Sequence, residues 1–258
     1  MPTSPLKPVD TRALFRPLTS GFVPLLRGLA PEDWLKPTIA GTWLVRDVVA
    51  HMVDLMFRRL SFHRDAMTPP PPSQPIRSER DFIDFINGLN AEWVGASKRF
   101  SPRVLTDLFE RAGADLSDWF AALPLDAPAL FGVSWAGEMT SEGWFDVGRE
   151  FVEIWHHQQQ VRLAVGAPLL TETRFLRPVI EIAMRALPHK FSKPSSRSYA
   201  KATFGHWQRP RAPAARLQKC WTSTIAPAGP RRCHRSARAM ARPPGLTAIR
   251  TAIAQAPS

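Results

Sequence analysis

The chain has 258 residues, of which 44% are hydrophobic, and a formal net charge of +12. This hydrophobic content can supply one substantial core, or a core and a small second domain, and it excludes a chain that is disordered throughout. Charged residues interrupt every apolar stretch before the roughly 18 residues that a membrane-spanning helix needs, so no such helix is expected. The first residues lack the apolar core of a secretion signal, and we expect a cytoplasmic location.

Apolar residues at three- and four-residue spacing predict amphipathic helices along the first 190 residues. The predicted helices cover about 11–29, 43–66, a broken or kinked third helix from 78 to 119, 144–166 and 171–187. The run TPPPPSQP at 68–75 predicts an extended connector, because proline cannot continue a helix. Within the third helix, Ser101-Pro102 supplies an N-cap and a first-turn proline, which marks the break. No strand-like alternation is present, so the fold class is predicted as all-α: a four-helix bundle with an extra helix.

The excess positive charge lies at the C-terminal end of the chain. Residues 191–258 contain 13 Lys or Arg and no Asp or Glu, whereas residues 1–190 contain 21 basic and 22 acidic residues. This tail has no sustained periodicity and is predicted to be largely irregular and disordered. Two interpretations are open: a basic arm that binds nucleic acid, or the translation of a shifted reading frame. We favour the second, because acidic residues disappear abruptly after Glu181.

The domain predicted over 1–190 contains no cysteine. Both cysteines of the chain, Cys220 and Cys233, lie in the tail, where they and His234 lack the paired spacing of a zinc site. We assign them no role. Any thiol chemistry of the main domain therefore needs a thiol from outside the protein.

Three residues of the helical domain are candidates for holding a metal ion. Glu153 and His157 are four residues apart, so a helix places them about 5 to 6 Å apart on one face. His51 flanks the apolar stripe of the second predicted helix. Three nitrogen and oxygen ligands that leave one position open are typical of catalytic zinc sites. Spacing alone does not show that these residues bind a metal ion. A Glu/His pair at this spacing is more often solvated, and a lone histidine beside an apolar face is more often a hydrogen-bonded core residue.

Two segments resemble a known family. The stretch PEDWLKPTIAGTWLVRDVVAHMVD at 31–54 and the later stretch FVEIWHHQQQVRLAVGAP at 151–168 resemble the metal-binding N-terminal domain of mycothiol-dependent maleylpyruvate isomerases. This domain belongs to the DinB-like superfamily, and the resemblance covers most of residues 9–190. It implies a DinB-like bundle in which His51, Glu153 and His157 bind a divalent metal ion, by expectation zinc. Two departures are Gln160, where family members often have an acid, and a tail unlike the further domain of the isomerases.

Other residues rank below these three. His156 lies about 100° around the helix from His157, so it is predicted to be exposed or to support a metal ligand without binding the ion itself. Glu150 is the more credible substitute ligand. His63 is predicted to be a surface residue, and Trp43 and Trp155 are predicted to be packing residues that could line a pocket.

The resemblance implies a metal-dependent isomerase or transferase that uses mycothiol, or a similar small thiol, on a small electrophile. A second hypothesis is a protein that binds or sequesters metal or a small molecule without turnover. A third, which we rank last, is nucleic-acid binding through the basic tail, with affinity that falls steeply with salt. The expected partners are therefore a small-molecule thiol and an electrophile, with no membrane partner, for a monomer or homodimer.

Overall fold

The structure is a computed structural model that describes residues 7–187, apart from 73, 130, 131, 134, 135, 139 and 186. The predicted tail at 191–258 and the predicted domain boundary at residue 190 lie outside the described residues. The prediction of an all-α fold is confirmed, and no strand occurs among the described residues, where two isolated β-bridges join Pro37 to Leu44 and Pro128 to Glu142.

The helices follow the chain in this order: α1 (Arg12–Ser20), α2 (Val23–Gly28), the 3-10 helix η1 (Asp33–Leu35), α3 (Val45–Arg58), the π-helix η2 (Arg59–Arg64), α4 (Glu79–Ser97), α5 (Pro102–Ala121), α6 (Gly143–Val165) and α7 (Thr173–Met184). None of the helices in the described part of the chain is long and apolar enough to span a membrane.

The first predicted helix is wrong as a single element. It is divided into α1 and α2, with Gly21 as the C-cap of α1 and Phe22 as the N-cap of α2. Pro24 in the first turn of α2 explains the division, because its ring nitrogen carries no proton for a hydrogen bond to the preceding turn. The apolar spacing continues through the break, which is why the sequence pattern alone did not show it.

The break that was predicted within the third helix is confirmed. α4 ends at Ser97, and α5 begins at Pro102 with Ser101 as its N-cap. The Ser101 hydroxyl accepts a hydrogen bond from the Val104 backbone N–H at 3.3 Å, which satisfies one of the free donors at the start of the helix. The second predicted helix is also present, but its last turns widen into the π-helix η2.

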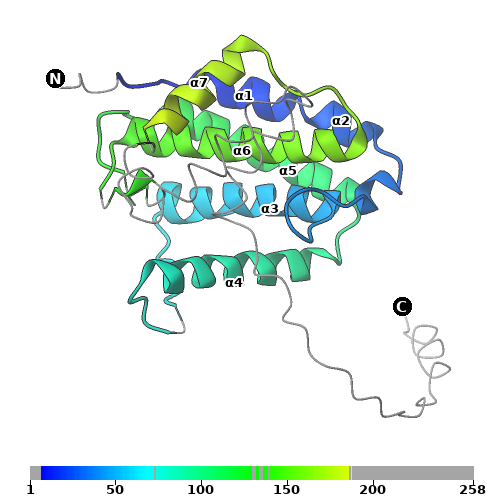
Figure 1. Cartoon of the computed structure of the whole chain (residues 1–258), viewed down its shortest axis with the longest axis horizontal. Helices are drawn as coiled ribbons and strands as arrows, with labels where there is room; N and C mark the ends of the chain where they lie inside the picture. Colours follow the sequence, from blue (N-terminus) through cyan, green and yellow to red (C-terminus); the bar gives the residue numbers. More distant parts are fainter. Residues whose placement is uncertain are drawn as a thin grey trace, which may run out of the picture. The chain divides into compact units, whose positions relative to one another are not determined.

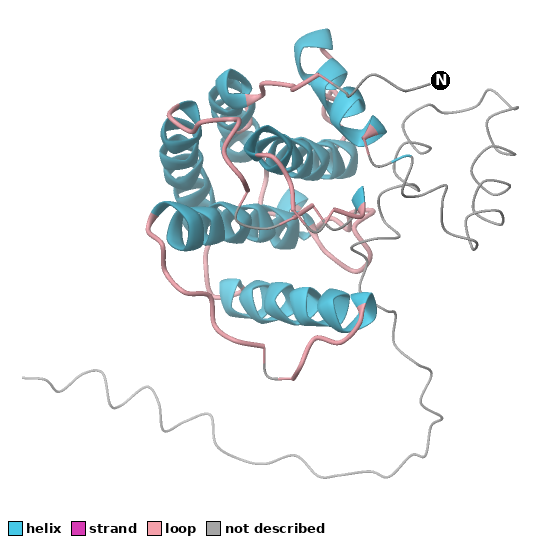
Figure 2. Ribbon diagram, turned by 90° about the vertical axis from the view of Figure 1, so that its left-hand side faces the viewer, coloured by secondary structure: helices cyan, strands magenta, loops and turns pink. Residues whose placement is uncertain are grey.

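α3 and α6 lie side by side, and this pairing positions the candidate site (Figure 1). α5 packs against α3 and α1, and α7 packs against α6. α4 packs against α3 and forms a separate layer in both views (Figures 1 and 2). Large aromatic side chains from α1, α5 and α6 fill the core, where Phe15 meets Phe120 and Phe151 edge to face.

α6 is buried around most of its circumference. Of its 23 residues 16 are buried, and seven of these are charged or amide-bearing or are histidine. Buried polar groups need partners inside the protein. The polar side chains of α6 must therefore find their partners inside the bundle, and the candidate site lies among them.

Candidate metal centre

The structure brings His51 of α3 and His157 of α6 into direct contact. Their rings meet edge to face with centroids 4.8 Å apart and an interplanar angle of 87°. Both side chains are buried, at 2% and 3% exposure. Two imidazoles from different helices thus share one enclosed position between α3 and α6.

Glu153 lies one helical turn before His157 on the same side of α6. Its Oε2 atom is 3.6 Å from Nε2 of His157, and the residue is 9% exposed. The three residues that the sequence suggested as ligands are therefore linked by two contacts, His51 to His157 and His157 to Glu153.

Two ring nitrogens at this position are buried with no hydrogen-bond partner among the described residues: Nδ1 of His51 and Nε2 of His157. Buried polar atoms are satisfied in the great majority of cases, so unmet ones call for a physical explanation. Imidazole nitrogen and carboxylate oxygen are common ligands of Zn²⁺. The chemistry of this donor set therefore fits a divalent metal ion.

Burial sets the charge of these groups. It lowers the pKa of His51 well below its usual value, with the neighbouring His157 and Arg58 acting in the same direction. Burial likewise lowers the pKa of His157 to about 4, although the hydrogen bond to Gln160 raises it. Both imidazoles are consequently neutral at pH 7, which is the form that binds metal.

The pKa of Glu153 is raised to about 7, because burial disfavours the carboxylate. Arg149 lowers this pKa and Glu150 raises it further. A cation beside Glu153 would favour its ionised form. As the side chains stand, however, no three His, Cys, Asp or Glu residues in the described ranges form a group that could hold a metal ion. Metal binding by His51, Glu153 and His157 therefore stays a prediction.

Trp43 and Gln160 complete the immediate surroundings. The Trp43 ring lies 4.9 Å from the His51 ring, centroid to centroid, so it packs against the site. Nδ1 of His157 is 2.8 Å from Oε1 of Gln160, and the Gln160 amide nitrogen is 2.9 Å from Nε2 of His156. His156 is half-buried and connected to His157 through Gln160. Trp155 is a packing residue whose indole N–H donates to the Leu170 carbonyl at 3.0 Å.

Glu150, the substitute ligand suggested by the sequence, belongs to a buried ionic cluster. Its Oε1 atom is 2.9 Å from Arg149 Nη2 and 3.7 Å from Arg59 Nε. Asp146 pairs with the same two arginines, at 2.6 Å to Arg59 and 2.9 Å to Arg149. We call Arg59, Asp146, Arg149 and Glu150 the ionic cluster. Both arginines of this cluster pair with Glu150. Glu150 itself lies one turn of α6 before Glu153.

Sequence reasoning missed this cluster, and His63 is less exposed than the prediction of a surface residue implied. Nε2 of His63 is 3.3 Å from Arg59 Nη1, and the residue is half-buried instead of exposed at the surface. Burial lowers the pKa of His63 to about 4, with the Arg59 charge acting in the same direction. The one available signal was the spacing of Asp146, Arg149 and Glu150 on a single helix, which also occurs on solvated faces.

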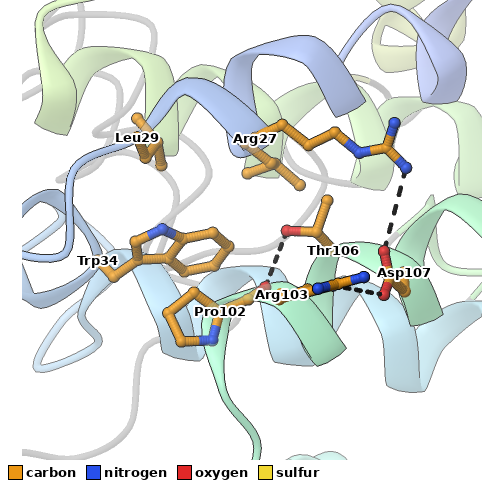
Figure 3. Close-up of a pocket in the computed structure, with 8 residues that line it drawn as sticks. Arg27, Leu29, Trp34, Pro102, Arg103, Thr106 and Asp107 are labelled. Atoms are coloured by element: carbon orange, nitrogen blue, oxygen red, sulfur yellow. Dashed lines mark hydrogen bonds and ion pairs between the residues drawn. The ribbon is translucent and has the colours of Figure 1, made fainter.

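A pocket of about 380 Å³ lies elsewhere, between α2, η1 and the start of α5. Figure 3 shows Arg27 and Arg103 reaching toward the Asp107 carboxylate, with Trp34 at the opposite side of the pocket. The lining consists of Leu26, Arg27, Leu29, Trp34, Pro102, Arg103, Thr106 and Asp107. None of the three candidate ligands is among these residues, so this pocket does not serve the candidate metal centre.

Comparison with known protein families identifies a related family. Residues 15–162 match the family model described as "Mycothiol maleylpyruvate isomerase N-terminal domain". The match covers more than half of the chain and includes His51, Glu153 and His157. Comparisons with curated proteins and with solved structures gave no match.

Proposed function

Because this chain belongs to the mycothiol maleylpyruvate isomerase N-terminal domain family, we propose that its bundle binds one divalent metal ion, zinc by expectation, through His51, Glu153 and His157. We further propose that the bundle uses this ion and a small thiol to isomerise a small electrophile or to transfer the thiol to it. The observation that carries the proposal is the buried contact between the His51 and His157 rings, with Glu153 Oε2 3.6 Å from His157 Nε2.

The state of the donors supports metal binding. Both imidazoles are neutral at pH 7, and each has one buried nitrogen without a hydrogen-bond partner in the described part of the chain. The pKa of Glu153 is about 7, so near neutral pH this carboxyl group is only partly protonated. A divalent cation would therefore need to displace a proton from only part of the protein molecules. Three protein ligands would leave a position for a small molecule, as in catalytic zinc sites.

An external thiol is the natural nucleophile for such a site. The two cysteines of the chain are Cys220 and Cys233, so the helical domain has none of its own. A bound divalent cation would stabilise a thiolate at neutral pH, as it does other coordinated acids. Mycothiol is the thiol that the family description names.

The isomerisation needs no net consumption of the thiol. The thiolate sulfur forms a bond to one carbon of a conjugated double bond, and the π electrons move toward the conjugated carbonyl. The former double bond is then single and can rotate. Reverse elimination breaks the carbon–sulfur bond, restores the double bond in the other geometry and releases the thiolate. If a proton adds instead of the sulfur leaving, the product is the thiol adduct of a transferase reaction.

His51, Glu153 and His157 would hold the ion in either reaction, and Trp43 would shield one side of His51 from water. The three side chains are buried away from water, so charge interactions at the site are stronger than in water. The alternative function is binding or sequestration of metal or a small molecule without turnover, which would use the same three residues.

Turnover separates these functions. The zinc-loaded full-length protein is incubated with maleylpyruvate, with and without mycothiol, and isomerisation is followed spectroscopically. We expect turnover that requires the thiol and that falls at least about 100-fold in Glu153→Gln, which removes the negative ligand. A protein that binds zinc stoichiometrically but turns over neither maleylpyruvate nor other conjugated electrophiles would refute the catalytic proposal and support sequestration.

A further inference from the structure

Gln160 is the one amide of α6 that contacts both histidines of the helix. Its side-chain oxygen lies 2.8 Å from Nδ1 of His157, and its side-chain nitrogen lies 2.9 Å from Nε2 of His156. The residue is 3% exposed, so water does not compete freely for these bonds. The three side chains form a hydrogen-bonded chain in the order His156, Gln160, His157.

The chemistry of an amide fixes which atoms donate and which accept in these two hydrogen bonds. An amide oxygen only accepts hydrogen bonds and an amide nitrogen only donates them. Nδ1 of His157 must therefore carry a proton and donate it to Gln160 Oε1, while Nε2 of His156 must accept from Gln160 Nε2. In a neutral imidazole one nitrogen is protonated and the other is not. It follows that Nε2 of His157 holds a lone pair.

The surroundings of Nε2 agree with this assignment of donors and acceptors. The atom is buried, has no hydrogen-bond partner in the described part of the chain and lies 3.6 Å from Glu153 Oε2. With the Gln160 amide reversed, the proton would sit on Nε2, and 3.6 Å to the carboxylate is too long for a hydrogen bond. A buried N–H group would then remain unsatisfied, which native proteins avoid more strictly than an unmet acceptor.

We propose that Gln160 is a positioning residue, which fixes His157 in the tautomer with its proton on Nδ1 and presents the Nε2 lone pair toward Glu153. The tautomer is a property of the metal-free protein. Its consequence for metal affinity rests on the proposed function. Groups that hydrogen-bond the second ring nitrogen of a histidine ligand orient the ring and tune its basicity, and their loss typically lowers metal affinity by about 10- to 100-fold.

The neighbouring glutamines supply a matched control. Gln158 is fully buried, and its side-chain nitrogen donates to the Leu18 carbonyl of α1 at 2.8 Å. It makes a buried hydrogen bond from the same helix, but the partner is the Leu18 carbonyl and not the His157 ring. Gln158→Met therefore removes a buried amide by the same substitution as Gln160→Met. It leaves the hydrogen bond between His157 Nδ1 and Gln160 Oε1 in place.

Nitrogen NMR of the metal-free full-length protein tests the proposal. Histidine-labelled protein is stripped of metal with a chelator and studied at pH 8 by long-range proton–nitrogen correlation, with His157→Asn identifying the His157 signals. We expect wild type and Gln158→Met to show a protonated Nδ1 and an unprotonated Nε2. Gln160→Met is expected to shift the population toward the Nε2-protonated form, whereas Gln160→Glu keeps an acceptor and is expected to keep the wild-type tautomer.

Two results would overturn the proposal: an Nε2-protonated His157 in wild type, or a Gln160→Met variant that keeps the Nδ1-protonated form. If Gln160→Met does not fold, the tautomers of wild type and Gln160→Glu test the proposal, and an Nε2-protonated His157 in either protein would contradict it. Zinc titration against a competing chelator gives the second readout, with about 10- to 100-fold weaker binding expected for Gln160→Met and little change for Gln158→Met. Absence of zinc binding in wild type would refute the proposed function but leave the tautomer measurement intact.

Discussion

Arg59 and Asp146 form an ion pair of 2.6 Å in which both side chains are only 6% exposed. Arg59 is the first residue of the π-helix η2, and Asp146 lies in the first turn of α6. The pair therefore ties the end of α3 to the beginning of the helix that carries Glu153 and His157. Arg149 and Glu150 complete the ionic cluster and leave its formal charges balanced. Local π-helical turns often occur at functional sites, and here the π-helix η2 carries the buried guanidinium of Arg59.

Removing Arg59 should be costly. Arg59→Met leaves the two carboxylates of the cluster buried with one guanidinium between them, and breaking a buried ion pair typically costs about 3 to 5 kcal/mol. We expect a loss of roughly that size in the free energy of unfolding measured with urea. The control is Arg80→Met, which breaks an exposed pair with Asp84 at 2.8 Å and should cost much less, because surface ion pairs contribute little to stability. Equal losses in the two variants would contradict a structural role for the cluster.

Two glycine substitutions should have opposite effects. A Cβ atom at Gly148 of α6 would lie 2.7 Å from Cδ1 of Ile182 in α7, so Gly148→Ala should destabilise the protein by about 1 to 3 kcal/mol through overpacking. At Gly88 of α4 a Cβ atom meets nothing within 4 Å, so Gly88→Ala should stabilise by about 0.5 to 1 kcal/mol.

Thermal unfolding followed by circular dichroism measures both glycine variants. The double variant Gly148→Ala/Ile182→Val tests the stated cause, because it shortens the side chain that the new methyl group meets. Recovery of part of the lost stability is expected. A Gly148→Ala protein as stable as wild type would show that α6 and α7 are not held in the close contact described.

His63 should make the protein less stable in acid. Its pKa is lowered to about 4 in the folded state from an ordinary value of 6.5, first by burial and then by Arg59, with Asp146 opposing and Arg149 adding. Between pH 6.5 and about 4 the unfolded chain binds a proton that the folded protein does not, so stability falls as the pH falls through this range. His63→Gln keeps a hydrogen-bond acceptor near Arg59 but removes the titration.

Urea unfolding at pH 7.5 and pH 5 measures this effect. The wild-type protein should lose more stability than His63→Gln between the two pH values, because all other titrating groups are common to both proteins. An identical loss in both proteins would show that the folded and unfolded pKa values of His63 do not differ.

Local sequence signals predicted much of the fold. Ser101 and Pro102 marked the start of α5, and Gly166, which adopts φ 72°, marked the end of α6. The division between α1 and α2 was not predicted, because the apolar spacing runs through it. The bundle itself followed from periodicity, since a helix must bury its apolar stripe against another helix.

The candidate site was less accessible from the sequence. Spacing placed Glu153 and His157 on one face of a helix, but only the resemblance to a family singled out His51 from α3. The hydrogen bonds of Gln160 to the two histidines and the burial of Arg59 could not be predicted, because sequence does not say which polar residues become enclosed. α6 is buried on most sides, so its periodicity does not identify the face that meets α3.

The metal content of the purified protein tests the central claim most directly. Wild-type protein, His51→Ala, His157→Ala and the control His63→Gln are purified in parallel and analysed by inductively coupled plasma mass spectrometry after equilibration with zinc. We predict about one zinc ion per chain in wild type and in His63→Gln, and a loss of most of the metal in His51→Ala and His157→Ala. Undiminished zinc in both alanine variants, or no stoichiometric metal in wild type, would contradict the assignment of His51, Glu153 and His157 as the metal centre.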